Sequence, residues 1–397
     1  MLSVEEALAR LLDQAQPLAD VETVATLDAD RRVLAAAVVS SIDVPPMDNS
    51  QMDGYAVRTA DVSSVPATLR VSQRIAAGQV GAPLAAGTAA RIFTGAPVPA
   101  GADAIVMQEA TTLDGDRVTI NEVPKAGAWI RRAGSDIASG AQVLAAGHRM
   151  RPQDCGLAAS IGVARLTVYR RLRVAVFFTG DELVMPGEPL PPGRIYNSNR
   201  FVLRGLLARL GCEVIDLGIV PDDLARTRAA FVEAAGRADL IVTSGGVSVG
   251  EEDHVKPAVQ AEGSLDLWQI AMKPGKPLAF GHVRGVPFIG LPGNPVSNFV
   301  TFLLFARPFI LARQGATELA PRALPLRAEF DLPKPDKRRE FLRVRANAHG
   351  GVEAFGNQNS AVLTSTAWAD GLVDNPPNHP IARGDTVRYL PFAELLA

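Results

Sequence analysis

The stretch Thr243-Ser-Gly-Gly-Val-Ser-Val-Gly-Glu-Glu-Asp253 follows a short apolar run at 240–242. The run predicts a buried strand, so the chain leaves a strand and enters a turn that contains two adjacent glycines. Gly245 and Gly246 can adopt positive φ and turn backbone N–H groups toward a ligand. The hydroxyls of Ser244 and Ser248 can donate hydrogen bonds to an anion. The turn is therefore a candidate anion-binding loop.

The same stretch ends in three carboxylates, Glu251, Glu252 and Asp253, which suit a divalent cation. A glycine-rich turn followed by carboxylates favours a phosphorylated ligand with bound Mg²⁺. An ordinary strand-to-helix turn with a solvated acidic end explains the same residues. Both interpretations stay open on this stretch alone.

Two further predicted strands also end in polar loops. The apolar run 172–178 ends at Thr179-Gly-Asp-Glu182, and the run 212–220 ends at Pro221-Asp-Asp223, with helices predicted at 197–210 and from 223 to about 236. This alternation predicts a parallel sheet with right-handed crossovers. Ligands bind at the carboxyl ends of such strands. The edge is predicted to collect Thr179, Gly180, Glu182, Asp222 and Asp253, which favours the functional interpretation.

The region that follows supplies lysines and a second helix start. Ala271-Met-Lys-Pro-Gly-Lys-Pro277 contains Lys273 and Lys276, and Leu291-Pro-Gly-Asn-Pro-Val-Ser297 opens a long apolar helix. The N–H groups at the start of that helix, with Ser297, predict a second anion site. The stretch 296–312 is too short for a membrane span and contains Arg307 and Pro308. We therefore predict a buried helix.

Short alternating runs with turn signals predict a small β unit at 66–130 and another after residue 320. Thr94 and the segment Arg131-Arg-Ala-Gly-Ser-Asp136 are polar features of the first. Arginine pairs suit phosphate or carboxylate recognition, although a solvated loop with local ion pairs is the alternative. Arg343 and the segment Gln358-Asn-Ser360 are polar features of the second.

The composition of the 397 residues is that of a globular protein, with 47% hydrophobic and 21% charged residues. The net charge of -2 gives no support to a nucleic-acid or membrane-surface role. Two distant cysteines, Cys155 and Cys212, fit a reducing compartment, and the N-terminal residues show no signal-peptide pattern. These features predict a cytoplasmic protein.

Six segments, taken together and in order, resemble the molybdopterin molybdenumtransferases of molybdenum cofactor synthesis. They are Asp48-Asn-Ser-Gln-Met-Asp-Gly-Tyr-Ala-Val57, Thr94-Gly-Ala-Pro-Val-Pro99, Thr179-Gly-Asp-Glu-Leu183, Thr243-Ser-Gly-Gly-Val-Ser-Val-Gly250, Lys273-Pro-Gly-Lys-Pro277 and Leu291-Pro-Gly-Asn-Pro-Val-Ser297. Each segment alone is a weak signal, but six in register over some 250 residues are specific.

The resemblance implies a multidomain α/β plus β fold and an elongated homodimer. Its domains would be 1–45 with 138–171 (an elongated linker and dimerisation domain), 46–137 (a small β domain), 172–320 (a doubly wound α/β domain shared with pterin adenylyltransferases) and 321–397 (a β-barrel-like domain). The implied reaction places molybdenum from molybdate on adenylylated molybdopterin, releases AMP and requires Mg²⁺. Other proteins of cofactor synthesis are further expected partners.

The resemblance also implies roles for the polar residues. Glu182, Asp222 and Asp253 would hold Mg²⁺ and orient the pyrophosphate, beside Thr179, Gly180, Ser244, Gly245, Gly246, Ser248 and Lys273. Molybdate would bind at Lys276, Pro277, Ser297, Arg343 and Ser360. Asp53, Thr94, Arg131 and Asp136 would face the α/β domain of the other subunit, so that the site needs the dimer.

Four positions depart from the family pattern: Phe178, His254, Gln269 and Asn359. Gln269 stands where some members have a lysine, and Asn359 replaces a small residue before Ser360. Two alternatives to the molybdenumtransferase remain. One is the adenylyltransferase that precedes it in the synthesis, and the other is a peptide-binding scaffold, a role that the related domain of gephyrin also has.

Overall fold

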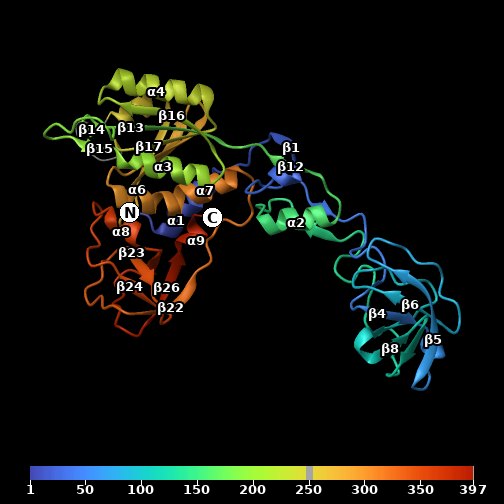
Figure 1. Cartoon of the computed structure of the whole chain (residues 1–397). Coiled ribbons are helices and arrows are strands. Elements are labelled where there is room, and N and C mark those ends of the chain that lie inside the picture. Colours follow the sequence, from blue (N-terminus) through green and yellow to red (C-terminus); the bar gives the residue numbers. More distant parts are fainter. Residues whose placement is uncertain (247–253, 397) are drawn as a thin grey trace.

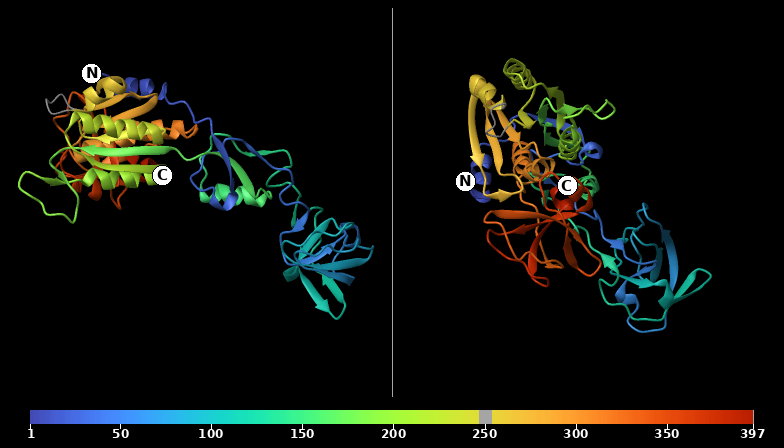
Figure 2. Two further views of the ribbon diagram at one scale, coloured as in Figure 1. Left: turned by 90° about the horizontal axis from the view of Figure 1, so that it is seen from above. Right: turned by 90° about the vertical axis from the view of Figure 1, so that its left-hand side faces the viewer.

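The computed structural model describes residues 1–246 and 254–396. The molecule is elongated, with a two-lobed body at one end, a small β domain at the other and a slender linker between them (Figure 1). Two further views show the same extended shape (Figure 2). The chain starts in the body, runs out to the N-terminal β domain, and returns through the linker to build the rest of the body.

One lobe of the body is an α/β domain with a six-stranded sheet in the order β16-β13-β17-β21-β20-β18. The strands β13 (Arg173–Thr179), β16 (Glu213–Val220) and β17 (Leu240–Ser244) are parallel, as predicted, and β21 (Val286–Leu291) is a fourth parallel strand. The strands β20 (Pro277–Val283) and β18 (Gly263–Gln269) continue the sheet in antiparallel fashion. The strands β20 and β21 form a hairpin.

Helices cover both faces of this sheet, because its central strands are apolar on both sides. The helices α4 (Leu224–Arg237) and α5 (Val255–Glu262) pack on one face, where Phe231 lies edge-on to Phe177 and Phe288. The helix α3 (Ser198–Arg209) packs on the other. The helices α3 and α4 begin at the side-chain caps Asn197 and Asp223, which accept hydrogen bonds from backbone N–H groups three residues on.

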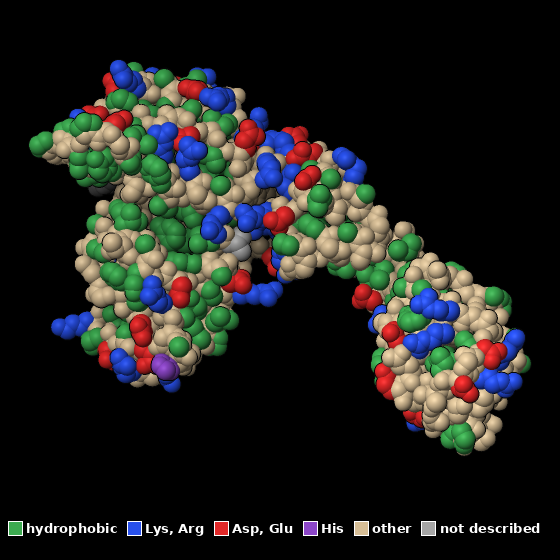
Figure 3. Space-filling view, in the orientation of Figure 1, with side chains coloured by type: hydrophobic (Ala, Val, Ile, Leu, Met, Phe, Trp, Pro, Cys, Tyr) green, Lys and Arg blue, Asp and Glu red, His purple; other side chains and the backbone are tan. Residues whose placement is uncertain are grey.

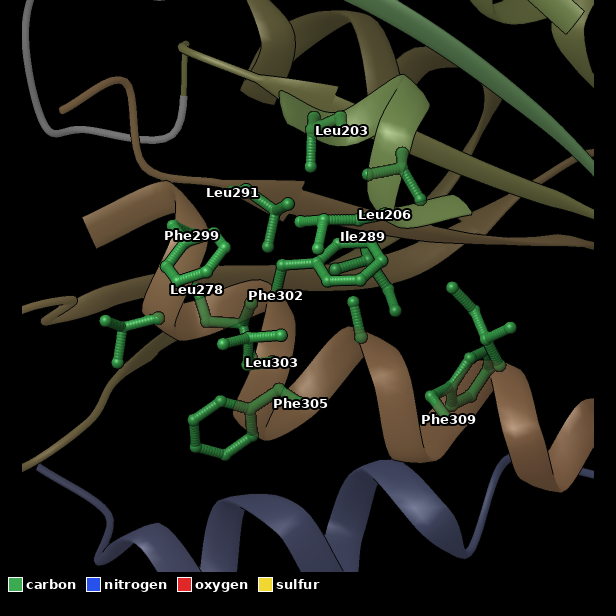
Figure 4. Close-up of a cluster of buried hydrophobic side chains, with 14 of the residues drawn as sticks. Leu203, Leu206, Leu278, Ile289, Leu291, Phe299, Phe302, Leu303, Phe305 and Phe309 are labelled. Atoms are coloured by element: carbon green, nitrogen blue, oxygen red, sulfur yellow. The ribbon is translucent and has the colours of Figure 1, made fainter. Parts of the chain in front are cut away.

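The predicted apolar helix is the centre of the body. It comprises α6 (Pro295–Thr301), a π-helical turn (Phe302–Ala306) and α7 (Arg307–Arg313), and 83% of its most apolar window is buried. Its hydropathy and 19-residue length would allow a membrane span, yet it lies between the sheet and the N-terminal helix α1 (Val4–Leu12) (Figure 4). It is a core helix of the body, as predicted.

The helix α1 begins at a capping box of Ser3 and Glu6 and ends at Leu12. Its apolar face, Val4, Ala7 and Leu11, packs in the core of the body and contacts α7. The division of domains given above groups this helix with the linker. That division stays a prediction, and α1 is the segment that it places away from its packing partners.

The N-terminal β domain is one six-stranded sheet in the order β7-β4-β6-β5-β9-β8, with a small apolar core on each face. Its strands are β4 (Gly54–Val57), β5 (Ala67–Ile75), β6 (Thr88–Ile92), β7 (Ala104–Met107), β8 (Thr111–Asp114) and β9 (Arg117–Ile120). A pair formed by β3 (Asn49–Ser50) and β10 (Ile130–Arg131) closes its base.

The linker consists of outgoing and returning segments that pair with each other. The pairs are β1 (Val21–Ala25) with β12 (Arg165–Tyr169) and β2 (Val38–Val39) with β11 (Gln142–Leu144), beside α2 (Pro152–Ser160). Pro152 lies in the first turn of α2, where its missing N–H costs no hydrogen bond.

The second lobe of the body is a C-terminal barrel. Its sheet runs β19-β23-β24-β22-β26-β25, and β23 also pairs with β25, which closes the sheet by hydrogen bonds. The strands are β19 (Met272–Lys273), β22 (Leu324–Ala328), β23 (Arg339–Ala346), β24 (Gly351–Ala354), β25 (Gly371–Asn375) and β26 (Thr386–Pro391), with the short helices α8 (Thr364–Trp368) and α9 (Phe392–Leu395). The expected barrel-like domain is confirmed.

Candidate active site

A cavity of about 700 Å³ lies where the parallel strands β13, β17 and β21 end. Its wall also includes the pair β14 (Leu183–Val184) and β15 (Ile195–Tyr196) and the start of α3 and α6. The cavity brings together nine of the residues singled out from the sequence, which are Thr179, Gly180, Glu182, Asp222, Ser244, Gly245, Gly246, Pro277 and Ser297. The volume suits a drug-sized or nucleotide-sized ligand.

Two of the strand-end loops are held together by a reciprocal pair of hydrogen bonds. The backbone N–H of Asp181 donates to Oδ2 of Asp222 at 3.0 Å, and the N–H of Asp222 donates to Oδ1 of Asp181 at 3.1 Å. One oxygen of each carboxylate is thereby committed to the opposite loop. The position of the Asp222 carboxylate at the cavity is therefore fixed by Asp181.

The glycine turn requires its glycines. Gly245 and Gly246 have φ of 95° and 64°, and a Cβ atom on Gly245 would lie 2.7 Å from the carbonyl oxygen of Thr179. Such a contact is too close for any side chain, and positive φ is also unfavourable for other residues. The turn after β17 therefore packs directly against the end of β13.

Ser244 is buried, with 3% of its surface exposed, and accepts two hydrogen bonds from side-chain amides. Nδ2 of Asn199 lies 2.9 Å from its Oγ, and Nδ2 of Asn298 lies 2.8 Å from it. These bonds connect β17 to the starts of α3 and α6. Donation from Ser244 to an anion stays a prediction.

The charge of the wall is unexpected for an anion site. Among the described residues that line the cavity, the charged side chains are the carboxylates Glu182 and Asp222, with no lysine or arginine. The starts of α3 and α6 both face the cavity and contribute the positive ends of helix dipoles. A multiply charged anion would need a cation or further basic groups in addition.

The two predicted lysines differ in their surroundings. Lys273 forms ion pairs with Glu340 at 3.1 Å and Asp336 at 3.6 Å, so its charge is paired within the barrel, between β19 and β23. Lys276 is exposed, and its ammonium group has no ion pair within the part of the chain that the structure describes. Lys276 is therefore the lysine that is free to bind an oxyanion, although neither side chain lines the cavity.

Arg343 and Ser360 come from the barrel. Arg343 is 1% exposed, and it donates through Nε to Ser365 and through Nη1 to the carbonyl oxygen of Phe341. Its Nη2 is buried and has no hydrogen-bond partner among the residues that the structure describes. Burial lowers the pKa of Arg343 to about 10. A buried guanidinium without a carboxylate partner has a free donor for an anion.

Ser360 reaches the cavity region through its backbone. Its carbonyl oxygen accepts a hydrogen bond from the N–H of Val296 at 3.1 Å, and the next residue, Ala361, lines the cavity. This bond uses one of the N–H groups at the start of α6 that the sequence suggests for an anion. The preceding Asn359 accepts from the N–H of Ala361 at 2.9 Å and so stabilises this loop.

The N-terminal β domain holds the remaining predicted residues, far from the cavity of the same chain. Oδ1 of Asp53 accepts from the backbone N–H and the hydroxyl of Thr94, both at 2.8 Å, and these bonds hold the pKa of Asp53 below its ordinary value. Arg131 and Asp136 line a separate open hollow. Figure 3 shows open space between this domain and the body, so one chain does not bring the two sets together.

Two predicted residues, Ser248 and Asp253, lie outside the described residues. Within the described ranges no group of three or more histidine, cysteine or acidic side chains could hold a metal ion. The Mg²⁺ site expected at Glu182, Asp222 and Asp253 therefore stays a prediction.

Three polar residues at this site are not among those singled out from the sequence: Asp181, Asn199 and Asn298. Asp181 lies within the segment Thr179–Leu183, and Asn199 lies near the start of the helix predicted at 197–210. Asn298 directly follows Ser297. Because they lie at the ends of strands or the starts of helices, these residues could have been proposed as site residues from the sequence. Their partners are far away in the sequence and follow only from the fold.

Comparison with known proteins covers nearly the whole chain. Residues 2–162 match the model of the MoeA N-terminal region (domain I and II), residues 175–312 match the probable molybdopterin binding domain, and residues 325–392 match the MoeA C-terminal region (domain IV).

Curated relatives and solved structures agree with these matches. The chain is 40% identical over 404 residues to the molybdopterin molybdenumtransferase of Haemophilus influenzae, with 100% of both chains covered. It is 39% identical to molybdopterin molybdenumtransferase 2 of Mycobacterium tuberculosis over 95% of this chain and 96% of that protein. The crystal structure of the molybdopterin biosynthesis moeA protein of Pyrococcus horikoshii superposes with a TM-score of 0.86 at 28% identity, covering 98% of this chain and 100% of that one.

Proposed function

The chain belongs to the molybdopterin molybdenumtransferase family, and from this premise we propose that it transfers molybdenum from molybdate to adenylylated molybdopterin and releases AMP with the help of Mg²⁺. It is thus a transferase of molybdenum cofactor biosynthesis. The observation that carries the proposal is the cavity at the strand ends, where a glycine turn, two helix starts and two carboxylates converge. A phosphorylated ligand with a bound cation fits these groups.

The acidic wall supports the proposed Mg²⁺. Oxygen ligands are those that Mg²⁺ prefers, and it usually binds one or two carboxylates together with substrate phosphates. Glu182 and Asp222 provide this donor set, with one oxygen of Asp222 already held by Asp181. Bound Mg²⁺ would neutralise the pyrophosphate charge. The N–H groups of the glycine turn and the Thr179 hydroxyl would orient the same group.

We further propose that molybdate binds between the cavity and the barrel. Lys276 is an exposed cation, and Ser297 and Pro277 line the cavity. Arg343 has a buried donor that finds no partner within residues 1–246 and 254–396. Ser360 closes the start of the same helix with its carbonyl oxygen. A doubly charged oxyanion would satisfy these donors, which otherwise carry a desolvation cost.

A homodimer with composite sites is the third part of the proposal. Asp53, Thr94, Arg131 and Asp136 belong to the region 46–137, and its β domain lies at the opposite end of the molecule from the body (Figure 1). The N-terminal β domain of a second subunit would bring them to the cavity. A cytoplasmic location and contacts with other proteins of cofactor synthesis complete the predicted setting.

The decisive assay supplies the purified protein with adenylylated molybdopterin and Mg²⁺, with and without molybdate, and measures AMP. We expect molybdate to stimulate AMP release and active cofactor to form, and Asp222→Ala to abolish both while the protein stays folded. AMP release at the same rate with and without molybdate would refute the proposed transfer of molybdenum. Consumption of ATP and free molybdopterin would indicate the adenylyltransferase, and tight peptide binding without turnover would indicate a scaffold.

A mixing experiment tests the composite site. Asp53→Ala and Asp222→Ala should each be inactive, because each removes one half of every site. Random exchange of subunits between them places one intact site in each mixed dimer, so that about a quarter of the wild-type activity should return. Mixtures that stay inactive after verified subunit exchange would exclude sites built from two chains.

A further inference from the structure

We propose that Asn199 and Asn298 are positioning residues that direct the hydroxyl proton of Ser244 into the cavity, where an anionic phosphate oxygen of the ligand accepts it. The inference deepens the proposed function and relies on it for the identity of the ligand. It assigns Ser244 one defined role, that of an uncharged donor, and assigns the two amides the task of enforcing that role.

The orientation of both amides follows from their other partners. Nδ2 of Asn199 lies 2.7 Å from the carbonyl oxygen of Gly293, and Nδ2 of Asn298 lies 3.1 Å from the carbonyl oxygen of Pro292. A carbonyl oxygen can only accept a hydrogen bond, so in each case the NH₂ group faces it. The second hydrogen of each NH₂ group then points to Oγ of Ser244.

Two incoming hydrogen bonds determine what the hydroxyl of Ser244 can do. A serine oxygen has two lone pairs and one proton, and both lone pairs accept from the amides. The hydroxyl therefore has donation as its one remaining possibility. Within the described ranges Ser244 donates to no protein acceptor, while its residue lines the cavity.

Burial makes this arrangement stable. Ser244 is 3% exposed and Asn298 is fully buried, so bulk water does not compete for the bond between them, while Asn199 is half-buried. The three residues come from α3, β17 and α6, whose positions are set by the apolar core beneath them. The direction of the proton is thus fixed before a ligand arrives.

The chemistry fits a phosphate beside an acidic wall. Ser244 offers a hydrogen bond without a charge, and no covalent bond or proton transfer is involved. Its contribution should appear in the binding of the phosphate, because a ground-state contact raises affinity without changing the chemical step.

A double-mutant cycle on the full-length protein tests the coupling, with AMP as the probe and its Kd measured by calorimetry. Ser244→Ala should raise the Kd about ten- to hundredfold, the value of a hydrogen bond to a charged group. Asn199→Ala should raise it about three- to tenfold, because the hydroxyl can then rotate away. The double variant should be within about twofold of Ser244→Ala, because Asn199 acts through that hydroxyl.

A merely structural role for Asn199 predicts a different result. The two effects would then multiply, and a double variant that binds AMP at least threefold more weakly than Ser244→Ala would overturn the inference. Asn121→Ala, which removes an exposed amide of the N-terminal β domain, is the matched control and should leave the Kd unchanged. Thermal melting of all variants verifies that each is folded.

The outcomes separate this inference from the proposed function. Coupled effects on AMP binding without molybdate-stimulated AMP release would support the inference and refute the function. If the effects of Ser244→Ala and Asn199→Ala on the Kd multiply, and the enzyme does release AMP with molybdate, the inference is refuted and the proposed function stands. Wild-type protein that binds no AMP at millimolar concentration would overturn the proposed phosphate site and the inference together.

Discussion

The reciprocal hydrogen bonds between Asp181 and Asp222 allow a sharp test of how the acidic site is built. In the wild type the N of Asp222 lies 3.1 Å from Oδ1 of Asp181. Asp181→Ala removes this acceptor, while Asp181→Asn keeps an oxygen at that place. The bond from the N–H of Asp181 to the Asp222 carboxylate, at 3.0 Å, survives in both variants. Comparison of the two variants therefore isolates one hydrogen bond and leaves Asp222, the proposed metal ligand, unchanged.

The size of the effect follows from the bond that is lost. Both loops are partly solvated, so the bond is worth about 1 kcal/mol, which corresponds to roughly a fivefold change in rate. Asp181→Ala should therefore slow turnover about fivefold and raise the Mg²⁺ concentration needed for half-maximal rate. Asp181→Asn should remain within about twofold of the wild type, because its amide oxygen still accepts. Asp222→Ala, by contrast, should abolish turnover.

Initial rates of molybdate-stimulated AMP release, measured over a series of Mg²⁺ concentrations, provide the readout. Melting temperatures serve as the control for folding. They should change little, because the substitutions of Asp181 lie in an exposed loop. If Asp181→Asn is as slow as Asp181→Ala, Asp181 acts through its charge and is a metal ligand itself. If both variants match the wild type, the reciprocal pair does not position Asp222.

Three further predictions concern single residues. Molybdate should raise the melting temperature of the wild type but not of Arg343→Met, and an equal rise in both, at constant ionic strength, would exclude Arg343 from the oxyanion site. Gly245→Ala should lose AMP binding at least tenfold, because its Cβ would meet the carbonyl oxygen of Thr179 at 2.7 Å; calorimetry that finds wild-type affinity would contradict this. Lys276→Met should raise the KM for molybdate with little change in melting temperature. Lys273→Met should instead lower the melting temperature by leaving Glu340 buried and unpaired, and the opposite pattern would reverse the two roles.

The α/β domain could be predicted well because its signals are local. Apolar runs such as 172–178 are long enough to define buried strands, and the caps Asn197 and Asp223 define helix starts. The strand β25 has a weak local signal, since Gly371–Asn375 mixes apolar and acidic residues and its pairing depends on closure of the barrel. The packing of α1 on α7 was equally beyond reach, because those segments are separated by nearly the whole chain.

The candidate site shows the same limit. The three strand-end loops could be placed at one edge because parallel strands share their direction. Which charged side chains form ion pairs with each other could not be predicted from the sequence. Lys273 and Lys276 look alike in the sequence, yet one is paired with Glu340 and the other is not. The predicted roles of the site residues stay predictions until the variants are measured.

The packing of α1 also has a consequence for how the protein is made. Its apolar residues Val4, Ala7 and Leu11 are covered by a helix at Pro295–Arg313, which leaves the ribosome nearly 300 residues later. At about 5–20 residues per second, this interval is roughly 15–60 s. The strands of the N-terminal β domain, all within residues 49–131, can assemble long before then. A nascent chain thus has a finished β domain beside an uncovered apolar helix, and one released before residue 295 keeps that helix uncovered.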